Sequence, residues 1–284
     1  MHPVFPLELE RHIFLIAAEQ DRCTGAVLLR IAYRVRTWIE PCLYHSVDTA
    51  ESDVYAAFLR AAADKPDILR VGVRQMMASS LGFDDSITTL YHAIALCESL
   101  ERITIAESLT CTDLLPILAR LPIRRLAVTI DLIIPGTRLS EAAQCLRYVT
   151  HLEFFGSIFG SAMDEPSQAS EVIVALPSLT HLACAFPPRD PDAWLEKLPR
   201  LRVFLIAPLT WPPDSLLEAR YRDQRIVVTY WERWDECASY DEGYWDRAER
   251  FFEKKRRGEV PENEFRAIYD GPALPPLDSD ADDD

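Results

Sequence analysis

The sequence predicts an α/β fold in which parallel strands alternate with helices, and three observations lead to it. A Leu-x-x-Leu-x-Leu template, with apolar substitutes, recurs through the middle of the chain. A Leu-Pro pair precedes three of its copies, and helix-like stretches lie between the copies. Because strands that alternate with helices are joined by helical crossovers, we expect parallel strands. With units this short, the strands line one curved face and the helices line the other.

Six copies of the template begin 22 to 32 residues apart, a spacing that overlaps the length of about 20 to 29 residues of leucine-rich repeats. The copies are Ile68-x-x-Val71-x-Val73, Leu100-x-x-Ile103-x-Ile105, Ile123-x-x-Leu126-x-Val128, Val149-x-x-Leu152-x-Phe154, Leu179-x-x-Leu182-x-Cys184 and Leu201-x-x-Phe204-x-Ile206. Weaker candidates flank them at Tyr44-x-x-Val47 and at Ile226 to Val228. We therefore expect an irregular leucine-rich-repeat-like solenoid over residues 46–230.

The Leu-Pro pairs mark the places where a helix gives way to a strand. They are Leu121-Pro122, Leu176-Pro177 and Leu198-Pro199. Proline disfavours a helical residue before it and lacks the N–H that would continue the helix. The predicted helices span Ser52–Ala63, Ile87–Cys97, Thr112–Leu121, Ser140–Tyr148, Gln168–Leu176, Asp192–Leu198 and Asp214–Tyr221.

The C-terminal part differs in composition from the repeats. Aromatic and acidic residues fill positions 230–245 and lead into a helix through Arg257, with Trp245, Ala248, Phe251 and Phe252 on one face. We expect residues 231–270 to form a cap that closes the solenoid. Residues 271–284 contain five aspartates within the last seven positions and are typical of a disordered acidic tail.

The first 45 residues form a separate helical segment in this interpretation. Leu9, Ile13 and Ile16 make an apolar stripe at helical spacing. A second helix is expected from Ala26 to about Ile39, and Pro41 is expected to end it before the first strand.

This segment resembles the F-box family. The family's opening pattern Leu-Pro-x-Glu-Leu-x-x-x-Ile-Phe matches residues 5–14 at every fixed position except the first, where Phe5 stands for Leu. Val35-Arg-Thr-Trp38 and Pro41-Cys-Leu43-Tyr44 look like the family's later motifs, although the usual Cys/Ser-Lys/Arg-x-Trp core is replaced by Val35 to Trp38. A helical segment followed by a solenoid is similar to F-box proteins with leucine-rich repeats, and in particular to an uncharacterised fungal group.

The resemblance implies a substrate-recognition adaptor of a cullin-RING (SCF-type) ubiquitin ligase. The segment would dock on a Skp-type adaptor protein, and the repeats would hold the substrate. The residues that would face the adaptor or support that face are Pro6, Leu7, Leu9, Ile13, Phe14 and Trp38. The alternative is that the two helices only cap the open end of the solenoid, as every repeat array requires.

Strand alternation predicts where a partner would bind. In each copy the fourth and sixth residues point into the core, so the third and fifth point to the concave face of the sheet. The third positions are Arg70, Arg102, Arg125, His151, His181 and Val203, and the fifth are Gly72, Thr104, Ala127, Glu153, Ala183 and Leu205. The three arginines and two histidines would form a column suited to an acidic protein partner, with histidines that charge as the pH falls toward about 6.5. The alternative is an ordinary solvated face, partly neutralised by Glu101 and Glu153.

Composition excludes several classes of protein. The net charge of −15 argues against binding to nucleic acid, which requires clustered Lys and Arg. The seven cysteines are widely spaced and never in a Cys-x-x-Cys pair, so a disulfide framework or a zinc finger is not expected. A secretory signal and an apolar run long enough to span a bilayer are both missing, so we expect a cytoplasmic or nuclear protein without membrane contact.

Residue patterns for catalysis are missing as well. Nine glycines include no Gly-x-Gly-x-x-Gly and no Gly-Lys-Ser/Thr, so a doubly wound nucleotide fold has no support and no cofactor is expected. His151 and His181 have no further ligands at metal-binding spacing, so no metal site is expected. We interpret the chain as a non-enzymatic protein-binding module. The alternatives are a free-standing repeat scaffold with no ligase link and, more remotely, a hydrolase on an open parallel sheet.

Overall fold

The structure is a computed structural model that describes residues 5–79, 84–106, 109, 113–129, 136–157, 168–188, 190–207, 221–229 and 243–267. Eight strands form one parallel sheet whose order across the sheet is the order along the chain. They are β1 (Ser46–Asp48), β2 (Gln75–Ala78), β3 (Arg102–Ile105), β4 (Arg125–Val128), β5 (His151–Ser157), β6 (His181–Phe186), β7 (Val203–Ile206) and β8 (Ile226–Val228). This sequential order is that of a solenoid, because a doubly wound sheet reverses its strand order at a switch point.

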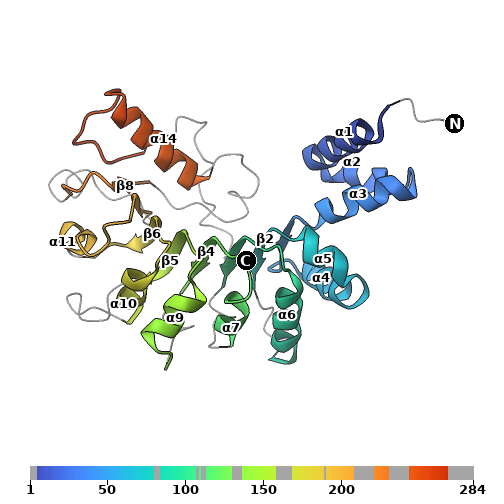
Figure 1. The fold of residues 1–284 in the computed structure, drawn as a ribbon, viewed down its shortest axis with the longest axis horizontal. Coiled ribbons are helices and arrows are strands. Elements are labelled where there is room, and N and C mark those ends of the chain that lie inside the picture. Colours follow the sequence, from blue (N-terminus) through green and yellow to red (C-terminus); the bar gives the residue numbers. More distant parts are fainter. Residues whose placement is uncertain are drawn as a thin grey trace, which may run out of the picture.

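Helices cover the outer face of this sheet. They are α4 (Ser52–Asp64), α5 (Pro66–Gly72), α6 (Asp84–Leu96), α7 (Leu114–Leu118), α9 (Leu139–Cys145), α10 (Gln168–Ala175) and α11 (Pro191–Leu195). Figure 1 shows them along the outside of an arc of strands, and α14 (Tyr244–Arg256) on the inside. The Leu-Pro pairs were predicted to mark the ends of helices, and this is confirmed for α7, α10 and α11. Each of these helices ends before its Leu-Pro pair, and a strand follows.

One backbone pattern aligns the repeats. The carbonyl oxygen of the residue before a strand accepts hydrogen bonds from two successive N–H groups of the next repeat. The carbonyl of Arg124, for example, accepts from Thr150 at 2.9 Å and from His151 at 3.0 Å. The same pair of bonds recurs at the carbonyls of His45, Arg74, Glu101, Arg124, Thr150 and Thr180. Consecutive strands are therefore held in one register.

The main core lies between the sheet and the outer helices. The fourth and sixth template residues are buried, as shown by Ile103 and Ile105 at 2% and 0% exposure. They pack with helix residues such as Ile94 and Leu118 in one continuous cluster from Val47 to Phe265. The repeat unit thus buries its apolar side only by stacking on its neighbours.

The first predicted copy of the template is wrong. Ile68 to Gly72 belong to α5, which begins at Pro66, and the strand of this repeat is β2. The residues Val73, Met76 and Ala78 also fit the template, and all three are 0% exposed. The template therefore matches the sequence at two overlapping places, one starting at Ile68 and one at Val73. Proline is favoured at the first position of a helix, so Pro66 favours a helix over residues 66–72 and leaves the strand to the second match.

The N-terminal segment contains three helices, α1 (Leu7–Gln20), α2 (Arg22–Leu28) and α3 (Tyr33–Leu43). The prediction of one helix from Ala26 to Ile39 is wrong, because a tight turn separates α2 from α3, with hydrogen bonds from Arg30 N–H and Ile31 N–H. Leu28, Leu29, Ala32 and Val35 all pack in the same small core, so the apolar pattern continues across the break. Pro41 lies inside the last turn of α3 and does not end the helix.

A close contact joins the N-terminal helices to the solenoid. Gly72, at the end of α5, lies so near α3 that a Cβ atom there would be 2.7 Å from the carbonyl oxygen of Pro41. Beside it, Lys65 Nζ donates a hydrogen bond of 2.5 Å to Glu40 Oε1. Burial raises the pKa of Glu40, but hydrogen bonds from Arg36 and Lys65 outweigh it and leave the pKa below its ordinary value.

Some predictions fall outside the described residues. They concern most of the helix expected at 214–221, the aromatic and acidic stretch from 230 to 242, and the acidic tail at 271–284. The helix expected through Arg257 is confirmed as α14.

Substitution Gly72→Ala should destabilise the protein, since its methyl group would enter the space of the Pro41 carbonyl. We expect a loss of about 1 to 3 kcal/mol in the free energy of unfolding, which urea titration followed by circular dichroism would measure. Gly243→Ala is the control, because nothing lies within 4 Å of its added Cβ. Equal unfolding midpoints for wild type and Gly72→Ala would contradict the proposed close packing of α5 on α3.

Candidate functional site

The inner face of the sheet is the face opposite helices α4 to α11. Pairing of Cα atoms places Gln75, Arg102, Arg125, His151, His181 and Val203 in one row across it. The alignment expected for the third template positions is thus observed from Arg102 to Val203. Neighbouring members of the row are about 4.8 Å apart, which is the spacing of parallel strands.

Arg70 does not belong to this row, contrary to the prediction. It lies on α5, where its guanidinium group is 2.6 Å from Asp67 Oδ1 and 3.4 Å from Glu98 Oε1. Gln75 takes its place beside Arg102, and Met77 replaces Gly72 at the fifth position. Both replacements follow because the strand of this repeat is β2, which begins at Gln75.

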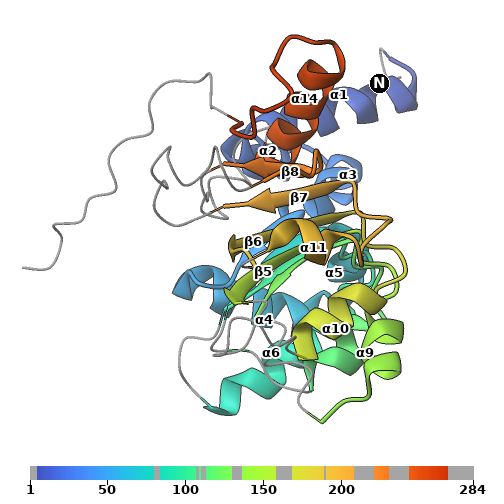
Figure 2. The same cartoon turned by 90° about the vertical axis from the view of Figure 1, so that its left-hand side faces the viewer.

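Helix α14 covers the inner face over β6 to β8. Tyr244, Trp245, Ala248 and Phe251 pack on it, and these four side chains are at most 7% exposed. They form a second core with the residues Ala183, Val203, Leu205, Ala207, Val227 and Ala267. Figures 1 and 2 show α14 crossing this end of the sheet. Helix α14, which belongs to the cap expected over residues 231–270, thus covers the inner face at this end of the sheet.

A signal for this cover is present in the sequence. The third positions from β2 to β6 are polar or charged, as at Arg102 and His181, but the third and fifth positions of β7 are apolar, at Val203 and Leu205. Apolar side chains on both faces of a strand indicate a sheet buried on both faces. The change in character after β6 thus marks where the inner face ceases to be open.

The two histidines lie at the edge of this cover. The rings of His151 and His181 stack with centroids 4.0 Å apart and an interplanar angle of 11°. The ring of Trp245 stands edge-on to both, at 5.3 and 5.7 Å. His181 Nε2 lies 2.8 Å from Glu249 Oε1 on α14. The hydroxyl of Tyr244 donates a hydrogen bond to Glu153, the fifth-position residue of β5.

Both histidines are uncharged at neutral pH in this arrangement. Burial, followed by the charges of His181, Arg125 and Arg102, lowers the pKa of His151 to about 3. Burial also lowers the pKa of His181, although the hydrogen bond to Glu249 opposes that shift. The expected cationic column with histidines that charge near pH 6.5 is therefore wrong in its histidine half.

Two arginines remain as the cationic part of the row. Arg102 is exposed and Arg125 is half-buried. Burial and the neighbouring Arg102 lower the pKa of Arg125, while Asp246 and Tyr244 in the first turn of α14 raise it. Arg102 and Arg125, together with Gln75, thus form an inner-face site bounded on one side by the start of α14.

The predicted docking residues of the N-terminal segment divide into two groups. Pro6, Leu7, Leu9 and Ile13 are exposed, with Leu7 at 51% and Leu9 and Ile13 at 53%. Phe5 and Ile16 are exposed as well, and the helical spacing of Leu9, Ile13 and Ile16 places these three on one face of α1. Phe14 and Trp38 are partly buried against the small core of Ala18, Val35 and Ile39. The second pair thus holds the helices together beneath the exposed face.

The described ranges contain no group of three or more His, Cys, Asp or Glu side chains arranged to hold a metal ion. Within the same ranges, every helix is too short or too polar to cross a membrane.

Acid should weaken the packing around His151. Its pKa is about 3 in the folded chain and about 6.5 when exposed, so its neutral, buried form stabilises the fold fully above pH 6.5 and progressively less as the pH falls toward 3. Between pH 7 and pH 5 the wild type should lose about 2 kcal/mol more unfolding free energy than His151→Phe, as measured by urea titration at both values. Substitution His12→Phe, at an exposed histidine on α1, serves as control. The same pH dependence in wild type and His151→Phe would contradict this assignment.

Comparison with known proteins adds little to this picture. By sequence, the chain matches no protein family and no curated protein. A solved structure described as a TLR13–ssRNA13 complex resembles 50% of the chain with a TM-score of 0.32 and 15% identity. The matched part spans a fifth of that chain, at 20% of its length. The repeat architecture therefore rests on the strand order and register described above.

Proposed function

We propose that the chain is a non-catalytic recognition protein that docks on a Skp-type adaptor of a cullin-RING ubiquitin ligase through α1 and holds an acidic protein partner on its inner face. The observation that carries the first half is the exposed apolar stripe of Leu9, Ile13 and Ile16 on α1. Phe5 and Leu7 are exposed at the N-terminal end of the same helix, and all five side chains are at 41% exposure or more. Contiguous exposed apolar residues usually mark a surface that binds another protein.

Capping of the solenoid does not account for this face. A cap buries its apolar stripe on the adjacent repeat. Here α1 packs mainly on α2 and α3, while α3 makes the contact with α5. The stripe of Leu9, Ile13 and Ile16 therefore points to solvent although another helix already closes the solenoid.

The face is held in a defined position. Arg34 of α3 donates a hydrogen bond of 2.6 Å to Glu10 of α1. The Lys65–Glu40 ion pair and the close approach of Gly72 then join α3 to the solenoid. A partner bound to α1 would thus be carried at a fixed place relative to the inner face, as an adaptor requires.

The inner-face site supports the choice of an acidic partner. Arg102 and Arg125 are adjacent in the strand register, on a chain with a net charge of −15. A guanidinium group offers a planar fork of donors that matches a carboxylate. Since the two histidines are covered and neutral, these arginines are the residues of the row that we expect to contact the partner.

Adaptor docking predicts that a charge on α1 prevents complex formation. Leu7→Asp and Ile13→Asp should each abolish co-elution with a purified Skp-type adaptor in size-exclusion chromatography, because burying an unpaired carboxylate in an apolar interface is strongly unfavourable. Leu139→Asp is the matched control, at a leucine that is 40% exposed on α9. All three variants should keep the wild-type melting temperature, since the replaced side chains lie on the surface. If the wild type does not co-elute, the ligase link is wrong and a free-standing scaffold is left.

A further inference from the structure

Arg102 and Arg125 form a pair of like charges on the inner face. They are adjacent in the register of β3 and β4, and burial together with the charge of Arg102 lowers the pKa of Arg125. Within the described ranges, neither guanidinium group has a hydrogen bond or an ion pair. A half-buried cation beside a second cation is unfavourable unless an anion joins the two. The pair therefore favours the binding of an acidic group.

The acidic residues around this pair are engaged elsewhere or act on it only from a distance. Glu101 pairs with Arg74 at 3.0 Å. Glu153 of β5 accepts its hydrogen bond from α14. Asp246, in the first turn of α14, attracts Arg125 through its charge, but the two form no ion pair in the part of the chain that the structure describes. A carboxylate from another segment would therefore complete the pair.

We propose that the acidic segment of this chain, residues 278–284, binds Arg102 and Arg125 and so competes with the acidic partner. The segment has five aspartates within seven positions, which are Asp278, Asp280, Asp282, Asp283 and Asp284. Carboxylates match the planar fork of donors that a guanidinium group offers. The proposal rests on the inner-face site of the proposed function and adds a regulation of that site by the chain itself.

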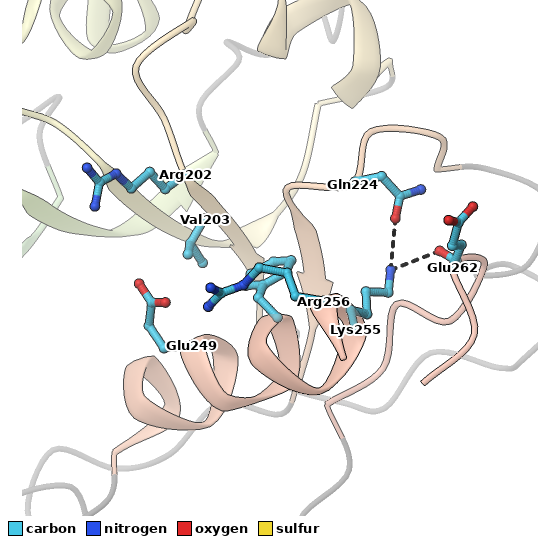
Figure 3. A pocket seen from close by; sticks show the side chains of 8 residues that line it. Arg202, Val203, Gln224, Glu249, Lys255, Arg256 and Glu262 are labelled. Atoms are coloured by element: carbon cyan, nitrogen blue, oxygen red, sulfur yellow. Dashed lines mark hydrogen bonds between the residues drawn. The ribbon is translucent and has the colours of Figure 1, made fainter. Parts of the chain in front are cut away.

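The structure fixes the point from which this segment extends. Ala267, the last described residue, donates a backbone hydrogen bond of 2.9 Å to the carbonyl oxygen of Val228 at the end of β8. Lys255 of α14 donates hydrogen bonds of 3.2 Å to Gln224 Oε1 and 2.9 Å to the backbone carbonyl of Glu262, as Figure 3 shows. The chain thus continues from a place beside β8 and α14.

The chain after Ala267 is long enough to reach the pair. Strands lie about 4.8 Å apart, so β8 is about 19 Å from β4 and about 24 Å from β3. An extended chain covers about 3.3 Å per residue, so residues 268–278 can span about 36 Å. The excess length allows the chain to pass around α14, which covers the inner face over β6 to β8. A segment tethered in this way acts at an effective concentration on the order of millimolar.

A second group of cations lies nearer to β8 but has acids beside it. Arg202, Lys255 and Arg256 line a cavity between α14 and the residue before β7, and Glu249 and Glu262 line the same cavity. Lys255 is engaged as described above, which leaves two cations against two acids and no excess of positive charge. The inner-face pair sets two cations against Asp246 and keeps such an excess. A run of aspartates is therefore attracted more strongly to the inner face.

The first test compares the wild type with a neutral-segment chain. This chain carries Asp278→Asn, Asp280→Asn, Asp282→Asn, Asp283→Asn and Asp284→Asn together. We expect the side-chain Nε–H signals of Arg102 and Arg125 in NMR spectra to differ between the two chains, because the variant loses the contact. The signals of Arg222, an exposed arginine before β8, and of Arg256 in the cavity should be the same in both. The differences should not depend on protein concentration, since the contact lies within one chain.

The second test uses an N-acetylated and C-amidated peptide with the sequence of residues 275–284. It should shift the signals of Arg102 and Arg125 saturably in the neutral-segment chain, and it should bind the wild type about fivefold more weakly, because the tethered segment competes. In the neutral-segment chain, Arg125→Gln should weaken peptide binding about tenfold and Arg102→Gln about threefold, since a half-buried charge contributes more than an exposed one. Arg222→Gln is the control and should bind the peptide unchanged.

The outcomes distinguish this proposal from the proposed function. Equal peptide binding by the wild type and the neutral-segment chain would overturn the competition and leave the inner-face site in place. A peptide that binds neither chain would overturn both. Differences that grow with protein concentration would indicate binding to a second copy and would overturn a contact within one chain. Differences confined to Arg256 would place the segment in the cavity and overturn the assignment to the inner face.

Discussion

The structure depends on the register set by one repeated pair of backbone hydrogen bonds. The carbonyl before each of the strands β1 to β6 accepts from two N–H groups of the next repeat, as Arg124 does from Thr150 and His151. This register directs residues such as Ile103 and Ile105 into the outer core and aligns Arg102 with Arg125 on the inner face. A shift by one residue would exchange the two faces, so the core and the candidate site are specified together.

The inner face of the sheet has two parts, which differ in the polarity of their side chains. Over β6 to β8 it is apolar, and α14 buries it with Tyr244, Trp245 and Phe251. Over β3 and β4 it carries Arg102 and Arg125, which α14 leaves partly open. The histidines lie at the boundary, and their burial beside arginines is the reason that they stay neutral. The open part of the inner face is therefore smaller and more uniformly cationic than a full row of third positions would be.

The two ends of the chain differ in how they finish the solenoid. At the N-terminal end, the contact of Pro41 with Gly72 closes the array through α3 and leaves the apolar face of α1 unused. At the C-terminal end, α14 buries its apolar side on the inner face, and charged residues of α14 and of the segment before β7 line a hollow beside it. One end thus presents exposed apolar side chains, and the other presents a hollow lined by charges of both signs.

The amino-acid sequence by itself determined the repeat architecture, because the Leu-x-x-Leu-x-Leu spacing and the Leu-Pro pairs are local patterns that require no knowledge of distant contacts. It also determined the alignment of Arg102, Arg125, His151 and His181, which follows from the template positions. Only the tertiary structure decided the strand of the second repeat, where two overlapping fits competed, and the place of α14. Which face an amphipathic helix covers depends on the surface that remains unburied after the sheet has formed. For the same reason, the neutrality of the histidines could not be predicted from spacing alone.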